Sequence, residues 1–215
     1  MKLYTYFRSS AAYRVRIALN IKGLAVEYIP KHLLREGGEH HLDDYLALNP
    51  QGLVPALEHE GRVIGQSLAI IEYLEDIRPD PPLLPDSAGE RAVVRSMALA
   101  IACDIHPLNN LRVLDYLKGP LGQGPEAVSR WYGHWIAEGF RGLEELAKRS
   151  SADGRHLYGS SVTLADVLLV PQVYNARRFN CGLSAYPTLT KISEHLESLP
   201  AFAAARPEAQ PDAES

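Results

Sequence analysis

The sequence predicts a two-part fold, in which an α/β domain over residues 1–80 precedes an all-α domain over residues 89–215. Strand-like and helix-like patterns alternate in the first part, whereas only helical patterns occur in the second. Between the two parts, the span from Arg78 to Ala88 holds four prolines. Because proline removes a backbone donor and interrupts regular elements, we interpret this span as the linker.

The first part is expected to follow the order β-α-β-α-β-β-α. Residues 2–7 alternate as a strand does, and a helical pattern then runs from Ser10 to Gly23, a residue typical of a helix end. A strand at 25–29 completes a strand–helix–strand unit, which favours a parallel pair. The other expected elements are a loop with a short helix at 37–49, a hairpin of residues 56–59 and 62–65, and a helix at 68–76 with Ser67 as its N-cap.

The second part reads as a series of helices. One helix is expected from about Glu90 to a break at His106-Pro107, and the next continues to about Lys118. Thr163 and Asp166 have the spacing of a capping box, in which each side chain satisfies a backbone N–H of the other, and they predict the start of a buried helix. One further helix is expected to carry both Trp131 and Leu143, a last helix is expected over 189–199, and the tail after Pro207 is expected to fray.

Composition excludes several classes of function. The chain has 26 acidic and 22 basic residues and lacks a basic half, so nucleic acid is not an expected partner. No run of 18 uncharged apolar residues occurs, so no membrane span is expected, and the N-terminus lacks the apolar region of a secretion signal. The two cysteines, Cys103 and Cys181, lie far apart and outside any CxxC pattern. This usage predicts a cytoplasmic protein without disulfides and without a metal site.

Two predicted helix starts carry polar residues suited to anions. Ser9 and Ser10 begin the first helix, and a hydroxyl that donates to a thiolate would lower the pKa of the thiol from its usual ~8.5. Gln66 and Ser67 begin another helix, whose free N–H groups favour a carboxylate. Plain N-capping explains the serines equally well at this level. Val54-Pro55 precedes a strand, which is the kind of position where proline is tolerated.

A set of motifs in a fixed order extends over nearly the whole chain. The motifs are Ser9-Ser10 before Tyr13–Leu19, Asn49-Pro50, Val54-Pro55, Gln66-Ser67, Asp104–Asn110, Thr163 with Asp166, Val170–Val173 and Asn175–Phe179. Together they resemble the glutathione transferases, and specifically the zeta class, the family of maleylacetoacetate and maleylpyruvate isomerases. One departure is Ala11, where the family commonly has a cysteine. This is tolerable if glutathione, and not the protein, supplies the sulfur nucleophile.

The resemblance implies a thioredoxin-like, glutathione-binding first domain and a helical, substrate-binding second domain. It implies glutathione as the cofactor, a small dicarboxylate as the substrate and a homodimer. The implied reaction is the cis-trans isomerisation of maleylacetoacetate to fumarylacetoacetate in aromatic amino-acid catabolism. The alternatives are isomerisation of maleylpyruvate, a zeta-type transferase or dehalogenase, and a binding module without catalysis.

The resemblance also assigns roles to individual residues. Ser9, followed by Ser10, is the expected catalytic hydroxyl, and Val54-Pro55 is expected to be a cis bond. Arginine suits a carboxylate because its planar fork binds both oxygens, and Arg178 and Arg8 rank above Arg112, with Arg177 last. The expected glutathione-binding residues are Ser9, His40, Val54, Gln66, Ser67, His106 and Asn110, and the expected substrate-carboxylate residues are Arg8, Arg112 and Arg178.

Overall fold

The structure, a computed structural model, describes residues 1–214 and divides into two compact units. The first unit comprises Met1–Pro82 together with the C-terminal segment that begins at Ser198, and the second comprises Leu83–Glu197. The predicted domains place that C-terminal segment with the helices instead.

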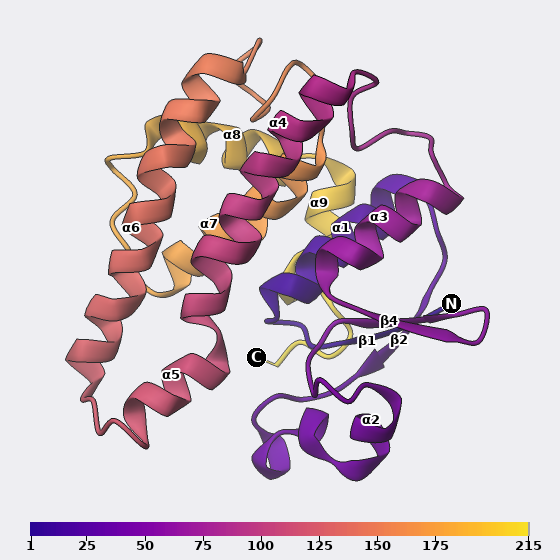
Figure 1. Cartoon of the computed structure of the whole chain (residues 1–215), viewed down its shortest axis with the longest axis vertical. Helices are drawn as coiled ribbons and strands as arrows, with labels where there is room; N and C mark the ends of the chain where they lie inside the picture. Colours follow the sequence, from indigo (N-terminus) through magenta and orange to yellow (C-terminus); the bar gives the residue numbers. More distant parts are fainter. Residues whose placement is uncertain (215) are drawn as a thin grey trace. The chain divides into compact units, whose positions relative to one another are not determined.

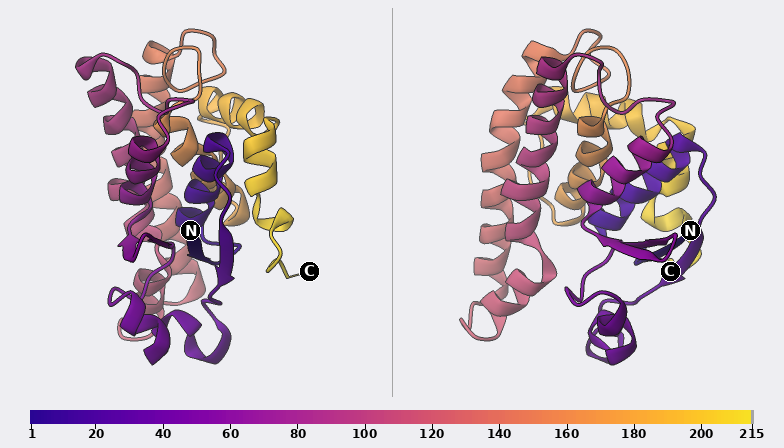
Figure 2. Two further views of the ribbon diagram at one scale, coloured as in Figure 1. Left: turned by 90° about the vertical axis from the view of Figure 1, so that its right-hand side faces the viewer. Right: turned by 45° about the vertical axis from the view of Figure 1, so that its right-hand side comes forward.

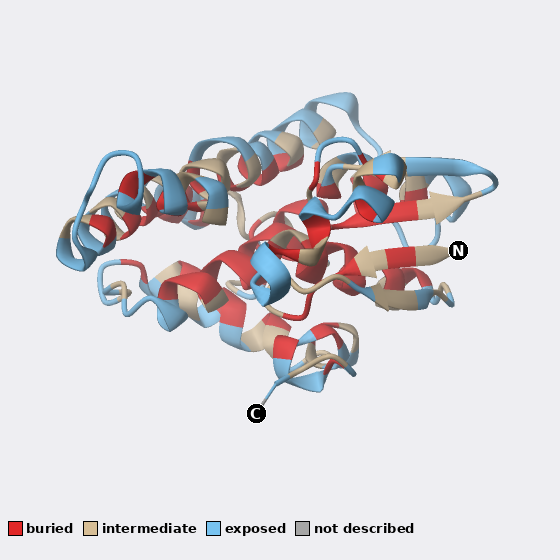
Figure 3. Cartoon of the chain, turned by 90° about the horizontal axis from the view of Figure 1, so that it is seen from below, coloured by how far each residue is buried: buried red, intermediate tan, exposed pale blue. Residues whose placement is uncertain are grey.

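The first unit contains a four-stranded sheet in the order β2-β1-β3-β4. As predicted, β1 (Lys2–Thr5) pairs in parallel with β2 (Glu27–Pro30), and β3 (Ala56–His59) forms a hairpin with β4 (Arg62–Gly65). β3 is antiparallel to β1, so the sheet is mixed. Residues of β1 alternate between half-buried and buried, which Figure 3 shows as tan and red beside the N-terminus.

Both residues of the β3–β4 turn have positive φ, 49° at Glu60 and 74° at Gly61. Positive φ at the two central residues matches the right-handed twist of the strands, which explains why the Glu-Gly pair predicted the hairpin correctly.

Helices cover both faces of this sheet. In Figure 1, α1 (Ser10–Lys22) and α3 (Ser67–Ile77) lie on one side, and α2 (Asp43–Leu48) lies on the other, a placement that Figure 2 also shows. The two short 3₁₀ helices before α2 are η1 (Arg35–Gly37) and η2 (Glu39–His41). Gly23 ends α1 with φ 61°, as predicted. The N-cap of α3 is Gln66 and Ser67 is its first residue, so the predicted cap is wrong by one position.

The C-terminal segment is ordered against α1. It forms α9 (Pro200–Ala205) and η5 (Pro207–Ala209), neither of which the sequence predicts. Gln210 is buried, and its Nε2 donates to the carbonyls of Ala204 and Arg206 at 3.0 and 2.8 Å. The expectation of a frayed tail is therefore wrong for the described residues, because its polar groups are satisfied within the first unit.

The second unit is helical throughout. Its elements are α4 (Ala88–Leu99), the π-helix η3 (Ala100–Ile105), η4 (His106–Asn109), α5 (Leu111–Lys118), α6 (Pro125–Ser150), α7 (Leu164–Arg178) and α8 (Pro187–Glu197). The predicted break at His106-Pro107 is confirmed, since the chain leaves α-geometry in η3 and η4. Leu83 and Leu84 are buried here, and the carbonyl of Leu83 accepts from the N–H of Leu164 at 2.7 Å. The end of the proline-rich span thus belongs to this unit.

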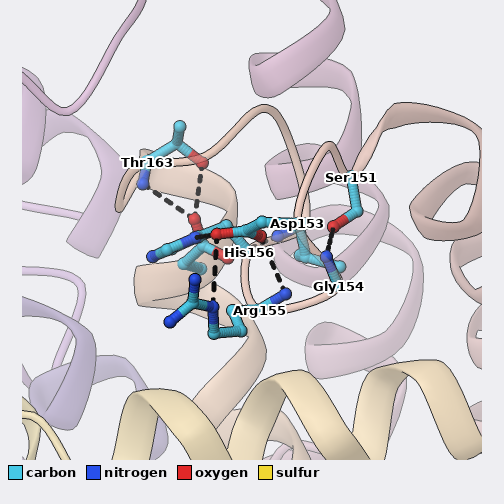
Figure 4. A network of polar contacts seen from close by, with 8 residues as sticks. Ser151, Asp153, Gly154, Arg155, His156 and Thr163 are labelled. Carbon is cyan, nitrogen blue, oxygen red and sulfur yellow. Dashed lines mark hydrogen bonds and ion pairs between the residues drawn. The ribbon is translucent and has the colours of Figure 1, made fainter.

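The predicted capping box at the start of α7 is confirmed. The Oδ2 atom of Asp166 accepts from the backbone N–H and the hydroxyl of Thr163 at 2.8 and 2.9 Å. Its Oδ1 accepts from the N–H of Leu157 at 2.7 Å, so the carboxylate also fixes the preceding loop. Figure 4 shows this loop, where Asp153 contacts the Nδ1 of His156 at 3.0 Å.

Over residues 1–214, no helix combines the length and apolar character needed to cross a membrane. In the same residues, no group of three or more His, Cys, Asp and Glu side chains is arranged to hold a metal ion.

Candidate active site

The loop between β1 and α1, residues 6–9, places Ser9 at the N-terminus of α1. Ser9 is the N-cap, and its Oγ accepts from the N–H of Ala12 at 3.2 Å. This bond uses a lone pair and leaves the hydroxyl its own proton to donate. Ser9 is half-buried, whereas Ser10 is buried and belongs to the first turn. The geometry therefore favours Ser9 over Ser10 for contact with a bound anion.

Arg16 holds this loop from inside the unit. Its side chain is completely buried, and its Nη2 donates to the carbonyl of Phe7 at 2.9 Å. Its Nη1 donates to the hydroxyl of Thr5 at 3.2 Å and to the carbonyl of Tyr6 at 3.4 Å. The carbonyl of Tyr6 also accepts from the N–H of Ser9 at 2.9 Å. A buried guanidinium thus fixes the backbone that presents Ser9.

The bond between Val54 and Pro55 is cis, as expected, and β3 begins at the next residue. The carbonyl of Leu53 accepts from the hydroxyl of Tyr45 at 2.6 Å and from the Nδ2 of Asn49 at 2.8 Å. These bonds fix the segment that carries Val54.

Gln66 and Ser67 form the start of α3 and have unusual local geometry. Gln66 has φ 65° and ψ 117°, a conformation that side chains rarely adopt and that is often retained at functional sites. Ser67 is buried, and its Oγ accepts from the Nη1 of Arg14 at 3.4 Å. The side chain of Arg14 is only 1% exposed. A helix N-terminus with a buried cation beside its serine is well suited to a carboxylate.

His40 is buried in η2, the 3₁₀ helix before α2. Burial, and secondarily the neighbouring His41, lowers the pKa of His40 to about 4, so the ring is neutral at pH 7. Its Nδ1 atom is buried and has no hydrogen-bond partner among the described residues. A neutral ring cannot attract a carboxylate by charge, so any contact of His40 with a ligand would be a hydrogen bond.

The remaining predicted glutathione-binding residues lie in the helical unit. His106 is the first residue of η4, and Asn110 is the N-cap of α5, where its Oδ1 accepts from the N–H of Arg112 at 3.2 Å. Two bonds attach η4 to α6, from the Nε1 of Trp131 to the carbonyl of Leu108 at 2.8 Å and from the Nδ2 of Asn109 to the carbonyl of Tyr132 at 3.1 Å.

Tyr132 also links α6 to the end of α7. Its ring stacks on that of Phe179 at 3.8 Å between centroids, and the guanidinium of Arg178 lies 5.2 Å from the centroid of Phe179. Within the helical unit, the structure therefore brings η4 and Arg178 to the same part of α6. Tyr132, which sequence reasoning missed, thus contacts both Asn109, in the segment between His106 and Asn110, and Phe179, the neighbour of Arg178.

The arginines differ in their availability to a ligand. Arg177 is paired with Glu197 at 2.7 Å, whereas Arg178 has no acidic group within ion-pair distance in residues 1–214. Arg112 is exposed on α5. In the first unit, the guanidinium of Arg8 lies 4.8 Å from the centroid of Phe7, directly beside Ser9 in sequence. The ion pair of Arg177 leaves its guanidinium less available than that of Arg178, and the ranking of the four arginines stays a prediction.

Sequence reasoning also missed the two buried arginines of α1, Arg14 and Arg16. The available signal was the occurrence of two charged residues within positions 11–19, whose other residues are all apolar or aromatic.

Comparison with known proteins gives matches over the whole chain. A family model described as the N-terminal domain of glutathione S-transferase matches residues 3–82. A probable maleylacetoacetate isomerase from Vibrio cholerae is 54% identical over 211 residues, which are 98% of this chain and 97% of that protein.

Two solved structures add information on ligands. A holo structure of maleyl pyruvate isomerase, described as a bacterial zeta-class glutathione S-transferase, is 47% identical, with a TM-score of 0.96 and coverage of 100% of both chains. A maleylacetoacetate isomerase from Anaeromyxobacter dehalogenans 2CP-1 has dicarboxyethyl glutathione and citrate bound in its active site. It is 40% identical, with a TM-score of 0.86 and coverage of 100% of this chain and 97% of that one.

Proposed function

The chain belongs to the glutathione transferase family, in its zeta class, and from that premise we propose that it is a glutathione-dependent isomerase that converts maleylacetoacetate into fumarylacetoacetate. The observation that carries this proposal is the Ser9 hydroxyl, half-buried at the N-terminus of α1 with its proton available to an anion. A sulfur anion is the ligand that this hydroxyl would stabilise in a glutathione-dependent enzyme.

The described residues fit glutathione. The start of α3, with the buried Ser67 and Arg14, suits the γ-glutamyl carboxylate, and Gln66 would contact the same end of the tripeptide. The backbone of Val54, beside the cis bond, would pair with the cysteinyl part. His40 would serve the glycyl end, together with His106 and Asn110.

Bound glutathione supplies the thiolate that adds to the cis double bond, permits rotation about the resulting single bond, and is released unchanged. The residues of this chain hold the charges that the reaction creates. Ser9 would keep the sulfur ionised by donating a hydrogen bond to it from its hydroxyl, and the N-terminus of α1 would add a smaller contribution. Ser10 is the second candidate for the hydroxyl. No protein nucleophile is needed, which explains why Ala11 is tolerated.

Arg8 and Arg178 would bind the carboxylates of the substrate, with Arg112 as a further candidate. Their guanidinium groups rest on the ring of Phe7 and the ring of Phe179, respectively, which limits their freedom and keeps the fork available.

Support for sulfur addition comes from the relative in Anaeromyxobacter, whose active site holds dicarboxyethyl glutathione. That compound has the composition of glutathione joined to a four-carbon unsaturated dicarboxylate. A site that holds such a compound accommodates both the tripeptide and a substrate-like dicarboxylate. The ligand of this relative is the basis for proposing a small dicarboxylate as the substrate of this chain.

Maleylpyruvate is the second candidate substrate, because the zeta-class relative at 47% identity is described as a maleyl pyruvate isomerase. Maleylacetoacetate is preferred because the relative at 54% identity is described as a probable isomerase of that compound. With this substrate the enzyme would act in aromatic amino-acid catabolism. We place it in the cytoplasm, where thiols are kept reduced, and as a homodimer.

The test is turnover of each maleyl substrate with and without glutathione. The proposal predicts turnover only with glutathione, no net loss of the thiol, and higher kcat/KM for maleylacetoacetate. Equal rates without glutathione would refute it, and accumulation of a stable thioether would indicate a conjugating transferase instead. Sedimentation of the same sample tests the homodimer, which a monomeric mass would contradict.

A further inference from the structure

We propose that Asp212, in the C-terminal segment, is a positioning residue for the loop that presents Ser9. The inference rests on the proposed role of Ser9. Asp212 is half-buried, and its Oδ2 accepts from the backbone N–H of Phe7 at 2.9 Å. Phe7 lies two residues before Ser9 and is only 3% exposed.

The Phe7 N–H has a strong requirement for a partner. A backbone donor in a buried position is costly when its hydrogen bond is lost, because water does not replace the missing acceptor. The acceptor here is a carboxylate, which forms a stronger hydrogen bond than a neutral oxygen does.

Asp212 and Arg16 act on the two ends of the same residue. The N–H of Phe7 donates to Asp212, and its carbonyl accepts from the Nη2 of Arg16 at 2.9 Å. Both peptide planes that flank Phe7 are therefore fixed. The next constraint along the chain is the bond from the Ser9 N–H to the carbonyl of Tyr6 at 2.9 Å. Loss of the bond from the Phe7 N–H to Asp212 would free the peptide plane before Phe7, where the turn toward Ser9 begins.

The C-terminal segment is itself anchored, so that Asp212 reaches Phe7 from a fixed origin. The Nδ2 of Asn20 donates to the carbonyl of Ala201 at 2.9 Å, and the Nε of Arg16 donates to the carbonyl of Ala205 at 3.1 Å. Gln210 then closes the turn that precedes Asp212. Beyond it, Glu214 lies 3.3 Å from the Nε2 of His32. These contacts hold the C-terminal segment in place, so that Asp212 restrains the loop between β1 and α1.

This arrangement makes Asp212 act on catalysis through Ser9 and not through contact with the substrate. Small misplacements of a catalytic group can reduce turnover by as much as about a hundredfold. Because the start of α3 is elsewhere in the unit, binding of the γ-glutamyl end should change little. The expected signature is therefore a lower kcat and a higher pKa of the bound thiol, with a nearly unchanged Kd for glutathione.

The experiment compares Asp212→Ala with Asp212→Asn in the full-length chain. The alanine variant loses the acceptor, and the asparagine variant keeps an oxygen that can accept from Phe7. A matched control is Asp153→Ala, which removes a carboxylate that accepts from the N–H of Arg155 at 2.8 Å in the helical unit. The readouts are hydrogen exchange of the Phe7 amide without glutathione, ultraviolet titration of the bound thiolate, the Kd for glutathione, and kcat.

Asp212→Ala is expected to speed exchange of the Phe7 amide, raise the pKa of the bound thiol and lower kcat about tenfold. Asp212→Asn should remain within about threefold of the wild type, and Asp153→Ala should shift the unfolding temperature alone. If Asp212→Ala does not fold, Asp212→Glu displaces the carboxylate by one methylene and provides the same test. The expected changes in amide exchange, thiol pKa and kcat are then smaller.

Two outcomes separate this inference from the proposed function. Unchanged exchange of the Phe7 amide, or an unchanged thiol pKa in Asp212→Ala, would overturn the role of Asp212. If instead Ser9→Ala titrates as the wild type does, the role of Ser9 fails, while the exchange measurement still reports on the contact between Asp212 and Phe7.

Discussion

Replacing Ser9 by alanine tests the chemistry on which the proposed function depends. The structure gives the Ser9 side chain two separable tasks. Its Oγ accepts from the N–H of Ala12 at 3.2 Å, which caps α1, and its O–H is the proposed hydrogen-bond donor to the sulfur of glutathione. Alanine removes both interactions, so the variant should lose stability and catalytic rate by independent amounts.

The catalytic effect follows from the strength of a hydrogen bond to an anion. Such a bond contributes about 1.5–3 kcal/mol, which corresponds to a change of about one to two units in the pKa of the thiol. A free thiol has a pKa near ~8.5, so a bound thiol held near ~7 is half ionised at pH 7. Without the bond, only about 3% is ionised. Turnover at pH 7 should therefore fall about fifteenfold, and the deficit should shrink as the pH rises toward ~8.5.

The structural effect follows from the loss of an N-cap. Removing a serine cap costs about 1 kcal/mol, which lowers the unfolding temperature of a chain of this size by about 2–4 °C. Ser87 provides a matched control, because it caps α4 in the helical unit and its Oγ accepts from the N–H of Glu90 at 3.2 Å. Ser87→Ala should lower stability to a similar degree and leave turnover unchanged.

The assay is a titration of the ultraviolet absorbance of bound thiolate, combined with kcat at several pH values and thermal unfolding of both variants. The reasoning is refuted if Ser9→Ala holds a thiol with the wild-type pKa. It is also refuted if Ser87→Ala loses as much turnover as Ser9→Ala, because the rate would then follow stability and not the hydroxyl.

Three further changes test other features of the structure. Gly139→Ala would place a methyl group against the Cγ1 and Cδ1 of Ile105, so urea unfolding should show a loss of about 1–3 kcal/mol, and an unchanged free energy would contradict this packing. Burial raises the pKa of Asp166 to about 6, so the stability that it contributes is present below about pH 4 and is lost as the pH rises through 6. The free energy of unfolding of the wild type relative to Asp166→Asn should therefore fall over that range, and a constant difference would be inconsistent with the raised pKa. Gln66→Gly should relieve the strain at φ 65° and raise the free energy of unfolding by about 1 kcal/mol. Calorimetry of the same variant should detect weaker glutathione binding. Equal unfolding temperatures for Gln66→Gly and Gln66→Ala would show that no strain is stored at this position.

Local backbone signals predicted most of the fold. Gly23, the pair Glu60-Gly61 and the capping box of Thr163 with Asp166 each have conformational requirements that few residue types satisfy. Such requirements act over four or five residues, so they are visible in the sequence without knowledge of the tertiary structure. The predicted N-cap Ser67 is wrong by one position for a related reason. The observed N-cap, Gln66, takes a conformation that a non-glycine residue rarely adopts, so its residue type does not predict it.

The site was predicted in part, and the limit is again physical. Motif order placed Ser9, Val54 and the start of α3, and the cis bond after Val54 is confirmed. The neutral state of His40 depends on how deeply its ring is buried, which spacing does not encode. The partner of the Phe7 N–H lies in the last residues of the chain, and no local pattern connects positions so far apart.

The spacing of the two arginines in α1 predicts burial of at least one of them, which a search for amphipathic faces does not consider. Residues two apart on a helix point about 200° away from each other, so Arg14 and Arg16 cannot share one exposed face. Both are buried, and Arg14 donates to Ser67 at the start of α3, whereas Arg16 donates to the carbonyl of Ala205 in α9. A charged side chain is retained in an interior only where it is hydrogen-bonded. The hydrogen-bond partner of each arginine therefore identifies the element that packs against that side of α1. The helix that corresponds to α3 was predicted from the sequence, although its contact with Arg14 was not. The element beside Arg16 is α9, which belongs to the C-terminal segment and lies outside the predicted first domain.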